Sequence, residues 1–231
     1  MSNGIREEDI RTAALFGSDA LEKLKKARVA VFGTGGVGGY ICESLARVGV
    51  GSLDIIDGDR VTLSNINRQI VALHSTVGEP KVEVMKKRIL DINPDCRINA
   101  HFAFYKPDGD ELIDFSDFDY IADAIDDVPA KIALAVRAKR EGVRIISAMG
   151  AGNKLDPSLF RVADLAKTEV CPLAKVMRKK LREYGITHMK VVFSPEVPRK
   201  NDLGVVGSSP FTPSVAGMII ASEIVKDLIG S

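Results

Sequence analysis

Cysteine is scarce in this chain, and no long apolar run is present. Cys42, Cys96 and Cys171 are the only cysteines among the 231 residues, and their odd number and wide spacing argue against a disulfide framework. No Cys-x-x-Cys pair occurs, which argues against a thiolate zinc site. No stretch approaches the roughly 18 consecutive apolar residues of a membrane span. Residues 1–8 hold no apolar core of a secretory signal. We therefore expect a cytoplasmic protein with no membrane contact.

An excess of charge of either sign is also missing. The chain has 32 Lys and Arg residues against 31 Asp and Glu residues. Such a balance gives no global attraction to nucleic acid, so any RNA contact must come from a local basic patch. With 45% hydrophobic residues the chain can bury a sizeable core. We expect one domain over residues 1–231, with a nucleotide-binding core at about 26–150 and a C-terminal extension at about 151–231.

Strand and helix patterns alternate along the first two thirds of the chain. The predicted strands cover residues 28–32, 52–56, 97–104, 119–124 and 143–148, and the helices between them include 79–92 and 129–141. Such alternation is typical of a parallel sheet. Beyond residue 150 the predicted elements are an edge strand at 160–163, a helix from about 173, a strand at 191–194, a surface loop at 195–210 and a helix at 215–229. The predicted fold class is α/β, with a doubly wound, mostly parallel sheet and a mixed C-terminal extension.

A glycine-rich turn follows the first predicted strand. Gly33, Gly35 and Gly38 satisfy the pattern G-x-G-x-x-G, with Gly36 between them, and apolar residues at helical spacing come next. Glycines let backbone N–H groups approach a phosphate closely, and the helix N-terminus adds the positive end of its dipole. The pattern fits sites for NAD, FAD, S-adenosylmethionine or ATP, and sometimes only a tight turn. It therefore predicts Rossmann-like nucleotide binding without choosing the nucleotide.

Carboxylates follow two other predicted strands. Asp57 ends the strand at 52–56, where ribose hydroxyls lie in a doubly wound sheet, and Asp59 comes two residues later. Asp126 follows the strand at 119–124, where a carboxylate suits Mg²⁺ held together with phosphate oxygens. Each carboxylate alone could belong to an ordinary solvated turn. Their placement around one crevice favours a site.

A polar cluster follows the second predicted strand. Arginine binds phosphate oxygens in a bidentate manner, and lysine acts as a mobile point charge. Together they suit a triphosphate, which is more anionic than the pyrophosphate of a dinucleotide. The ordinary alternative is a group of capping and surface residues. The cluster comprises Asn65, Asn67, Arg68, Gln69 and Lys81.

These motifs, in this order, resemble the ThiF/MoeB/ubiquitin-activating superfamily. The resemblance covers about residues 11–150, and enzymes of this superfamily adenylate a carboxylate with Mg-ATP and release pyrophosphate. The matching motifs are Gly33-x-Gly35-Gly36-x-Gly38, Asp57-x-Asp59, Ser64-Asn65-x-Asn67-Arg68-Gln69, Gly78-x-Pro80-Lys81 and Asp123-x-x-Asp126.

The resemblance implies roles for individual residues. Gly36 would approach the nucleotide phosphates and Asp57 would hold the ribose. Asn67, Arg68 and Lys81 would grip the phosphates, and Asp126 would hold Mg²⁺. In the superfamily an arginine from the N-terminal segment of one protomer completes the site of the other. Arg11 matches it best, although it could equally be an ordinary surface arginine, and the resemblance thus implies a homodimer.

Within the superfamily the chain resembles the tRNA threonylcarbamoyladenosine dehydratases. The segment Ala163-Asp-Leu-Ala-Lys-Thr-Glu-Val-Cys171-Pro-Leu-Ala carries this resemblance, with Asn65-Ile-Asn-Arg-Gln and Ile92-Asn-Pro-Asp-Cys96. The paired Cys-x-x-Cys zinc ligands usual in ubiquitin-like-protein activators are missing. The resemblance implies that ATP activates the threonyl carboxylate as an acyl-adenylate, which the carbamoyl group then attacks to close a ring and expel AMP. A sulfur-relay-type protein partner is a further expectation.

Two further features have competing interpretations. Cys171 is the candidate nucleophile if a thioester forms, but the residues favour a small buried side chain before a helix. A basic helix face with Arg199 and Lys200 is the best candidate for a tRNA footprint, and an ordinary solvated helix face is an equal alternative. The basic residues of that face are Lys175, Arg178, Lys179, Lys180 and Arg182.

Other function classes stay open at this point. The second hypothesis is an adenylyltransferase that activates the C-terminus of a ubiquitin-like sulfur-carrier protein. A third is a nicotinamide-dependent oxidoreductase, which leaves Asn67, Arg68 and Lys81 unexplained. A fourth is a nucleotide-binding module without chemistry, which would bind ATP but release no pyrophosphate.

Overall fold

The computed structural model describes residues 5–107 and 113–230, and their strands form one seven-stranded sheet. The strand order is β3-β2-β1-β4-β5-β7-β6, and neighbouring strands are parallel except for the antiparallel pair β6 and β7. The predicted doubly wound, mostly parallel sheet is therefore confirmed. The strands are β1 (Arg28–Phe32), β2 (Ser52–Ile56), β3 (Arg97–His101), β4 (Tyr120–Asp123), β5 (Arg144–Ala148), β6 (Arg161–Asp164) and β7 (Lys190–Phe193).

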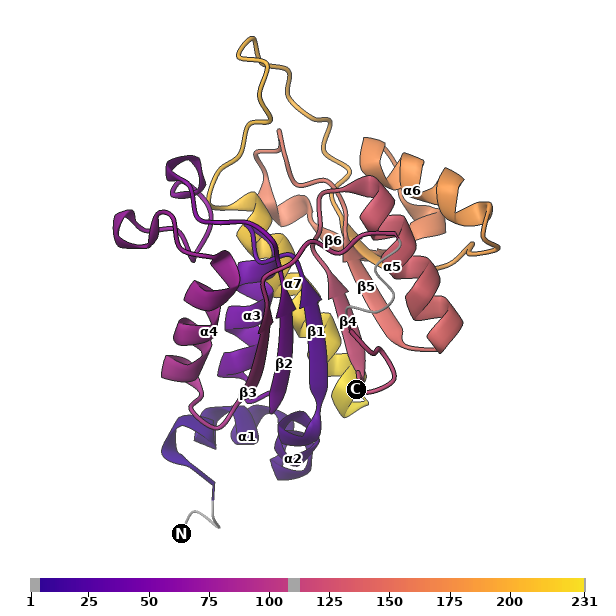
Figure 1. Cartoon of the computed structure of the whole chain (residues 1–231). Coiled ribbons are helices and arrows are strands. Elements are labelled where there is room, and N and C mark those ends of the chain that lie inside the picture. Colours follow the sequence, from indigo (N-terminus) through magenta and orange to yellow (C-terminus); the bar gives the residue numbers. More distant parts are fainter. Residues whose placement is uncertain (1–4, 108–112, 231) are drawn as a thin grey trace.

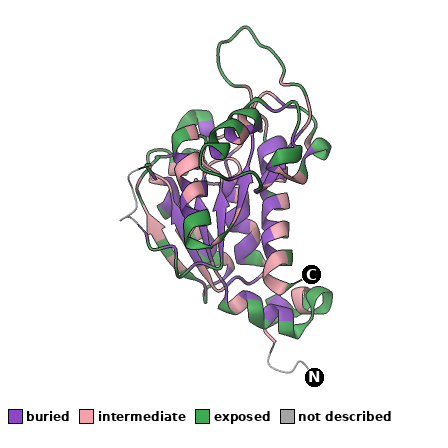
Figure 2. Cartoon of the chain, turned by 90° about the vertical axis from the view of Figure 1, so that its right-hand side faces the viewer, coloured by how far each residue is buried: buried purple, intermediate pink, exposed green. Residues whose placement is uncertain are grey.

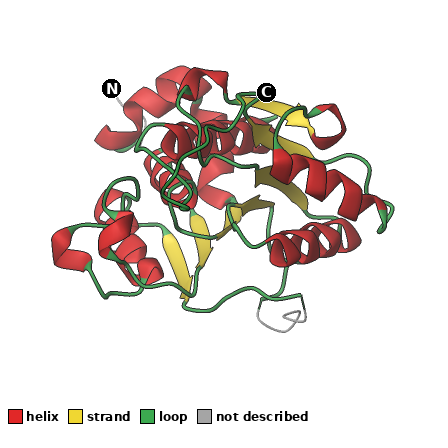
Figure 3. Cartoon of the chain, turned by 90° about the horizontal axis from the view of Figure 1, so that it is seen from above, coloured by secondary structure: helices red, strands yellow, loops and turns green. Residues whose placement is uncertain are grey.

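Helices cover both faces of this sheet (Figures 1 and 3). One face carries α3, α4 and α7, and the other carries α5 and α6, with α1 and α2 at the lower end in Figure 1. Among the described helices, none is both long and apolar enough to cross a membrane. The helices are α1 (Ile10–Phe16), α2 (Ser18–Lys26), α3 (Gly38–Arg47), α4 (Lys81–Ile92), α5 (Val128–Glu141), α6 (Pro172–Arg182) and α7 (Thr212–Ile229).

The core lies on both sides of the central strands. Successive side chains of a strand point to opposite faces. Val29 and Val31 of β1 pack in the cluster formed with α3, α4 and α7, whereas Ala30 and Phe32 pack in the cluster formed with α5. All four are fully buried, as expected for a parallel strand covered on both faces. Figure 2 shows that buried residues are concentrated in the strands and the inner faces of the helices.

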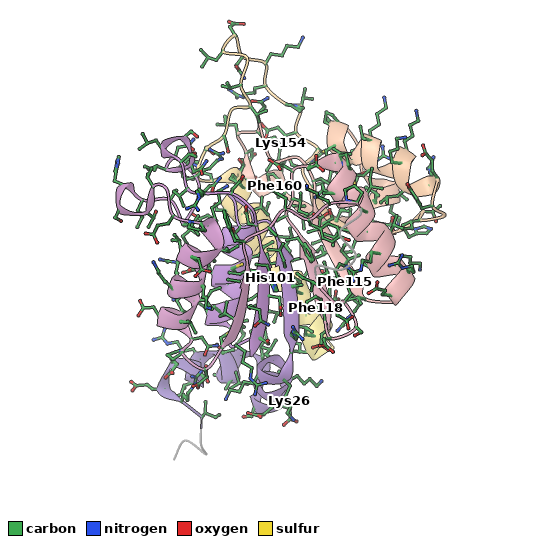
Figure 4. All side chains as sticks on the ribbon, viewed as in Figure 1. Lys26, His101, Phe115, Phe118, Lys154 and Phe160 are labelled. Carbon is green, nitrogen blue, oxygen red and sulfur yellow. The ribbon has the colours of Figure 1, made fainter. Side chains whose placement is uncertain are left out.

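An aromatic cluster closes the α5 side of the sheet. The Phe32 and Tyr105 rings meet edge to face with centroids 5.2 Å apart, and the Phe115 ring lies 5.7 Å from that of Phe32. Figure 4 labels Phe115 and Phe118 in this cluster, where their ring centroids are 6.1 Å apart. These contacts bring the segment after β3 against the carboxyl end of β1.

The strand order reverses between β1 and β4. In doubly wound sheets, ligands bind at the carboxyl ends of the strands where this reversal occurs. Here the turn that starts at Gly33 and the segment after Asp123 meet at that point. The Gly33 N–H donates to the Ile56 carbonyl oxygen at 2.7 Å, and the Ala124 N–H donates to the Phe32 carbonyl oxygen at 2.8 Å. The fold therefore places the predicted motifs at one crevice.

The C-terminal extension continues the same sheet. β7 pairs with β5 in parallel. β6 is the edge strand that the sequence predicts, and the structure shows that it pairs antiparallel with β7. Between β7 and α7, residues 195–211 form an arm that projects beyond the carboxyl ends of the strands (Figure 1). The sheet is continuous across residue 150, and the division of the chain at that point stays a prediction.

Asp127 caps the N-terminus of α5. Its Oδ1 accepts a hydrogen bond from the Ala130 N–H at 2.8 Å. We expect Asp127→Ala to lower the free energy of unfolding by about 1 kcal/mol, because an orphan donor of the first turn loses its partner. The melting temperature should fall by roughly 2–4 °C. Asp127→Asn, which keeps a capping oxygen, serves as the control, and equal losses in both variants would contradict the capping role.

Candidate active site

A cleft of about 810 Å³ opens at the crevice between the carboxyl ends of the strands. It collects residues from the glycine turn, the ends of β2, β4 and β5, the start of α4, and the arm. Most of the predicted site residues thus lie together, although the role of each stays a prediction. Those that line the cleft are Gly33, Gly35, Gly36, Asp57, Asp59, Arg68, Gln69, Lys81 and Asp126.

Two glycines of the turn, Gly33 and Gly38, are packed too tightly for side chains. Gly33 has a φ of 87°, and a Cβ there would lie 2.7 Å from the Ala124 carbonyl oxygen. A Cβ on Gly38 would lie 1.7 Å from the Gly33 carbonyl oxygen. Gly38 therefore lets α3 begin directly against the turn and lies behind the cleft lining. The turn presents bare backbone to the cleft, as phosphate binding requires.

Asp57 ties the glycine turn to the end of β2. Its Oδ2 accepts hydrogen bonds from the Thr34 N–H at 2.7 Å and the Thr34 hydroxyl at 3.0 Å. Its Oδ1 accepts from the Asp59 N–H at 2.8 Å. A carboxylate offers about four acceptor sites, so these bonds leave room for a further donor such as a ribose hydroxyl.

Lys81 is buried at the start of α4 and is held by Asp59. Its Nζ lies 2.8 Å from the Asp59 Oδ2, and its backbone N–H donates to the Asp59 carbonyl oxygen at 3.0 Å. Asp59, which the sequence predicts as a ligand-binding residue, thus contacts a protein cation directly. The pair fixes an ammonium group in the cleft wall, where it would attract an anionic ligand.

Asn65 and Asn67 lie outside the cleft lining and make structural hydrogen bonds. The Asn65 Oδ1 accepts from the Thr62 N–H at 3.1 Å, in a capping box around a short 3-10 turn. The Asn67 Nδ2 donates to the Ser208 carbonyl oxygen on the arm at 3.1 Å, and its Oδ1 accepts from the Arg68 Nη1 at 2.9 Å. The Asn65 side chain thus caps a turn, as in the capping alternative to ligand binding. Asn67 links Arg68 to the arm.

Gln69 has an unpaired oxygen in the cleft wall. The side chain is buried, and its Oε1 has no hydrogen-bond partner within the described structure. A buried polar atom without a partner costs free energy, so an orphan atom at a cleft points to a ligand donor.

Asp126 is one of three exposed carboxylates in the described cleft lining; of the other two, Asp59 pairs with Lys81 and Asp127 caps α5. Within residues 5–107 and 113–230, no group of three or more His, Cys, Asp and Glu side chains could hold a metal ion. Mg²⁺ is usually bound by one or two carboxylates together with substrate phosphates. An exposed carboxylate beside a phosphate-binding turn, such as Asp126, fits that donor set.

A buried ion pair lies beneath the segment that carries Asp126. Asp123 and Lys131 are fully buried, and the Lys131 Nζ lies 2.9 Å from the Asp123 Oδ2. The Ser147 hydroxyl donates to the same oxygen at 2.5 Å, and the Ile125 N–H donates to Oδ1 at 3.2 Å. Asp123 therefore holds the backbone just before Asp126. Sequence reasoning missed Lys131 and Ser147 because neither belongs to a recognisable motif.

Comparison with known proteins identifies the family. The ThiF family model matches residues 8–231. The chain belongs to the ThiF family. A tRNA threonylcarbamoyladenosine dehydratase of Bacillus subtilis is 43% identical over 237 residues, which cover 95% of this chain and 93% of the relative. A sulfur carrier protein adenylyltransferase of Thermus thermophilus is 30% identical, over 93% of this chain and 73% of the relative.

Solved structures agree with this assignment. The crystal structure of the Escherichia coli tRNA N6-threonylcarbamoyladenosine dehydratase in complex with AMP superimposes with a TM-score of 0.94 and 35% identity, over 99% of this chain and 96% of that chain. The complex of the same enzyme with ATP gives a TM-score of 0.90 over the same shares of the two chains. The predicted resemblance to this branch of the ThiF family is confirmed.

Two predicted catalytic residues of this ThiF-family chain lie outside the cleft lining. Arg11 is exposed on α1, at the opposite end of the sheet from the cleft (Figure 1). Cys171 is 2% exposed at the N-cap of α6, and a Cβ built on Gly150 of the cleft would lie 3.7 Å from its Sγ. The thiol is therefore a buried neighbour of the cleft wall.

The basic face of α6 is smaller than predicted. Lys175, Lys179, Lys180 and Arg182 are exposed, but Arg178 is turned inward, where its Nη1 donates to the Thr168 carbonyl oxygen at 2.7 Å. Arg178 is therefore excluded from the exposed patch, because it anchors the segment before α6. Arg199 and Lys200 are exposed on the arm.

Proposed function

We propose that this ThiF-family chain is an ATP-dependent enzyme that dehydrates N6-threonylcarbamoyladenosine in tRNA. It adenylates the threonyl carboxylate and cyclises it with overall loss of water, releasing AMP and pyrophosphate. The proposal is carried by one observation: the glycine turn, Arg68, Lys81 and Asp126 converge in the cleft of a chain that aligns over 95% of its length with an enzyme of this name. The proposal includes a cytoplasmic location, where the protein would meet its tRNA substrate.

ATP would lie along the glycine turn. Backbone N–H groups at Gly35 and Gly36 would face the phosphates, and Arg68 and Lys81 would neutralise them. Asp57 has acceptor capacity left for the ribose, and the unpaired Gln69 Oε1 would accept a further donor from the ligand. Mg²⁺ bound to Asp126 and to phosphate oxygens would stabilise charge that develops on the phosphoryl oxygens.

The chemistry consists of two displacements. A carboxylate oxygen of the substrate attacks the α-phosphorus, the bond to the bridging oxygen breaks, and pyrophosphate leaves. A nitrogen of the carbamoyl group then attacks the acyl carbon and loses its proton, and the bond from that carbon to the AMP oxygen breaks. Ring closure of this kind has an effective molarity on the order of 10⁵–10⁸ M when the groups are well oriented. It needs no enzyme nucleophile, so we assign no covalent step to the buried Cys171.

The tRNA would bind at the end of the molecule where the cleft opens. The exposed lysines and arginine of α6 and the basic residues of the arm lie beside the cleft end of the sheet (Figure 1). A local basic patch of this kind supplies phosphate contacts in a chain without global excess charge. The patch comprises Lys175, Lys179, Lys180, Arg182, Arg199 and Lys200. A sulfur-relay-type protein partner stays a prediction.

A second copy of the chain would complete the site. Helix α1 has no buried residue, and Ile10, Leu15 and Phe16 are 45%, 75% and 37% exposed. An apolar surface of this kind favours burial in an interface. In a two-fold dimer, Arg11 on α1 of one protomer would reach the cleft of the other.

Mixing two inactive variants tests this arrangement. Arg11→Ala and Arg68→Ala should each lose activity, and the subunit-exchanged mixture should regain about a quarter of wild-type activity, because half of the dimers hold one intact site in two. The measurement is AMP release after subunit exchange. No recovery in a mixture that remains dimeric would contradict a shared site.

The second candidate, activation of a sulfur-carrier protein, is favoured by the similarity to the Thermus adenylyltransferase. The two functions differ in which carboxylate supports ATP–pyrophosphate exchange. We expect exchange with tRNA that carries threonylcarbamoyladenosine and none with a small carrier protein ending in Gly-Gly. Exchange that appears only with the carrier would overturn the proposed function.

A further inference from the structure

The cleft consists of two chemically different halves. All ionisable residues of its described lining belong to the half built from residues 33–127, which includes Asp57, Arg68, Lys81 and Asp126. The other half has no ionisable residue among the lining that the structure describes. It is formed by Ala148, Met149, Gly150, Ala151, Gly152, Leu173, Val206 and Ser208, whereas Pro213 of the lining packs against Gly36 of the first half. The first half suits phosphates, and the second suits a neutral group.

The arm forms the outer wall of the uncharged half, and Asn153 forms hydrogen bonds with both of its sides. The Arg199 N–H donates to the Asn153 carbonyl oxygen at 2.7 Å, and the Asn153 N–H donates to the Gly207 carbonyl oxygen at 2.8 Å. The Gly207 N–H donates to the Asn153 Oδ1 at 2.6 Å. Asn153 adopts a φ of 59°, a left-handed conformation that is uncommon outside glycine. Asn153 thus anchors both sides of the arm from an uncommon backbone conformation.

The foot of the arm is held by Lys154, which Figure 4 labels below it. The Lys154 Nζ donates to the carbonyl oxygens of Ser194 at 2.7 Å and Glu196 at 3.0 Å. Burial lowers the pKa of this ammonium group, although Cys171 and Glu196 act in the opposite direction. The arm is therefore anchored firmly at its base while its distal residues remain exposed.

Gly152 allows Val206 to close against the cleft. A Cβ built on Gly152 would lie 2.3 Å from the Val206 Cγ1. Gly152 is not among the glycines with positive φ, so its backbone would accept alanine and only the space excludes it. Val206 is 73% exposed, so the arm rather than the core keeps it over the cleft. This packing makes Val206 a wall whose position depends on Gly152.

We propose that the uncharged half of the cleft receives the modified adenine of the tRNA with its threonylcarbamoyl group, and that Val206, seated on Gly152, is the wall that selects it. The inference rests on the proposed function. Enzymes that act on a base inside RNA or DNA take the base out of its stack and bind it between apolar side chains. A planar, neutral base suits a lining of small apolar residues. The threonyl carboxylate of the modified base would then reach the phosphate half of the cleft, and the RNA backbone would remain near Arg199 and Lys200.

A double-mutant cycle tests the wall. Gly152→Ala should lower kcat/KM for dehydration of modified tRNA by about tenfold, through a higher KM for the tRNA, because the added methyl displaces Val206. Val206→Ala should lower it by about threefold, because part of the wall is lost. The double variant should be no worse than Val206→Ala, because the clash is gone. The affinity for ATP, measured by calorimetry, should change less than about twofold in all three.

Some outcomes would overturn the role of Val206 as a wall, and a different outcome would overturn the proposed function. Wild-type activity in Gly152→Ala, or losses that add in the double variant, would overturn the wall. Asn153→Gly keeps the left-handed backbone and removes the Oδ1 acceptor of the Gly207 N–H and the Asn201 Nδ2, both on the arm. It should also raise the KM for tRNA without affecting ATP affinity. An unchanged KM in that variant would likewise overturn the inference. A wild-type enzyme that binds ATP but leaves the modified tRNA unchanged would instead overturn the proposed function itself.

Discussion

Asp126→Ala is expected to lower the rate of tRNA-dependent pyrophosphate release by about three orders of magnitude. Metal-assisted charge stabilisation contributes several kcal/mol, and each 1.36 kcal/mol corresponds to a tenfold change in rate. Asp126 is an exposed carboxylate in the cleft lining, so its removal leaves no buried cavity and the fold should persist. The measurement is ATP–pyrophosphate exchange at saturating tRNA, with the melting temperature recorded in parallel.

The neighbouring carboxylate supplies the matched control. Asp127 also lines the cleft, but its Oδ1 caps α5. Asp127→Asn removes a negative charge one residue away and keeps the cap, so we expect a rate loss of less than about tenfold. Equal effects of the two substitutions would show that general charge near the cleft matters and that Asp126 has no specific metal role.

Lys131→Met is expected to lower the free energy of unfolding by about 3–5 kcal/mol. The substitution leaves the Asp123 carboxylate buried without its cation, and breaking a buried ion pair from one side has this typical cost. The melting temperature should fall by roughly 6–20 °C for a chain of this size. Denaturant unfolding measures the loss in the free energy of unfolding, and we expect the m-value to stay unchanged.

The double variant Asp123→Asn/Lys131→Met is the internal control for the ion pair. Because it removes both charges, it should recover most of the stability that the single variant loses. The Ile125 N–H would keep an oxygen acceptor at position 123, so the segment before Asp126 should stay in place. A double variant less stable than Lys131→Met would contradict the assignment of the loss to an uncompensated charge.

Local patterns predict the strands and most helix boundaries, although β3 ends at His101 and not at residue 104. β1 reads as a continuous apolar run because it is covered on both faces, and α5 ends at Gly142 because that residue adopts a φ of 72°. The sequence also predicts the edge strand β6, and it predicts the long arm because proline, glycine and asparagine mark a surface segment.

Contacts between residues that are far apart in the sequence could not be predicted from local patterns. Asn65 stands in a motif read as ligand-binding, yet its side chain closes a cap three residues back, an alternative that composition alone leaves open. Lys131 looks like any lysine of an amphipathic helix until β4 and β5 place Asp123 and Ser147 beneath it. Asn153 holds the arm through partners 46 and 54 positions along the chain. These features depend on tertiary packing, which local sequence patterns do not predict.

Mass spectrometry of tRNA nucleosides tests the central claim most directly. tRNA that carries threonylcarbamoyladenosine would be incubated with the protein and Mg-ATP, digested, and compared with a reaction containing Asp126→Ala. We predict a modified adenosine lighter by one water in the wild-type reaction, with AMP and pyrophosphate formed in equal amounts. An unchanged nucleoside, in a protein that still catalyses exchange with a sulfur-carrier protein, would contradict the claim.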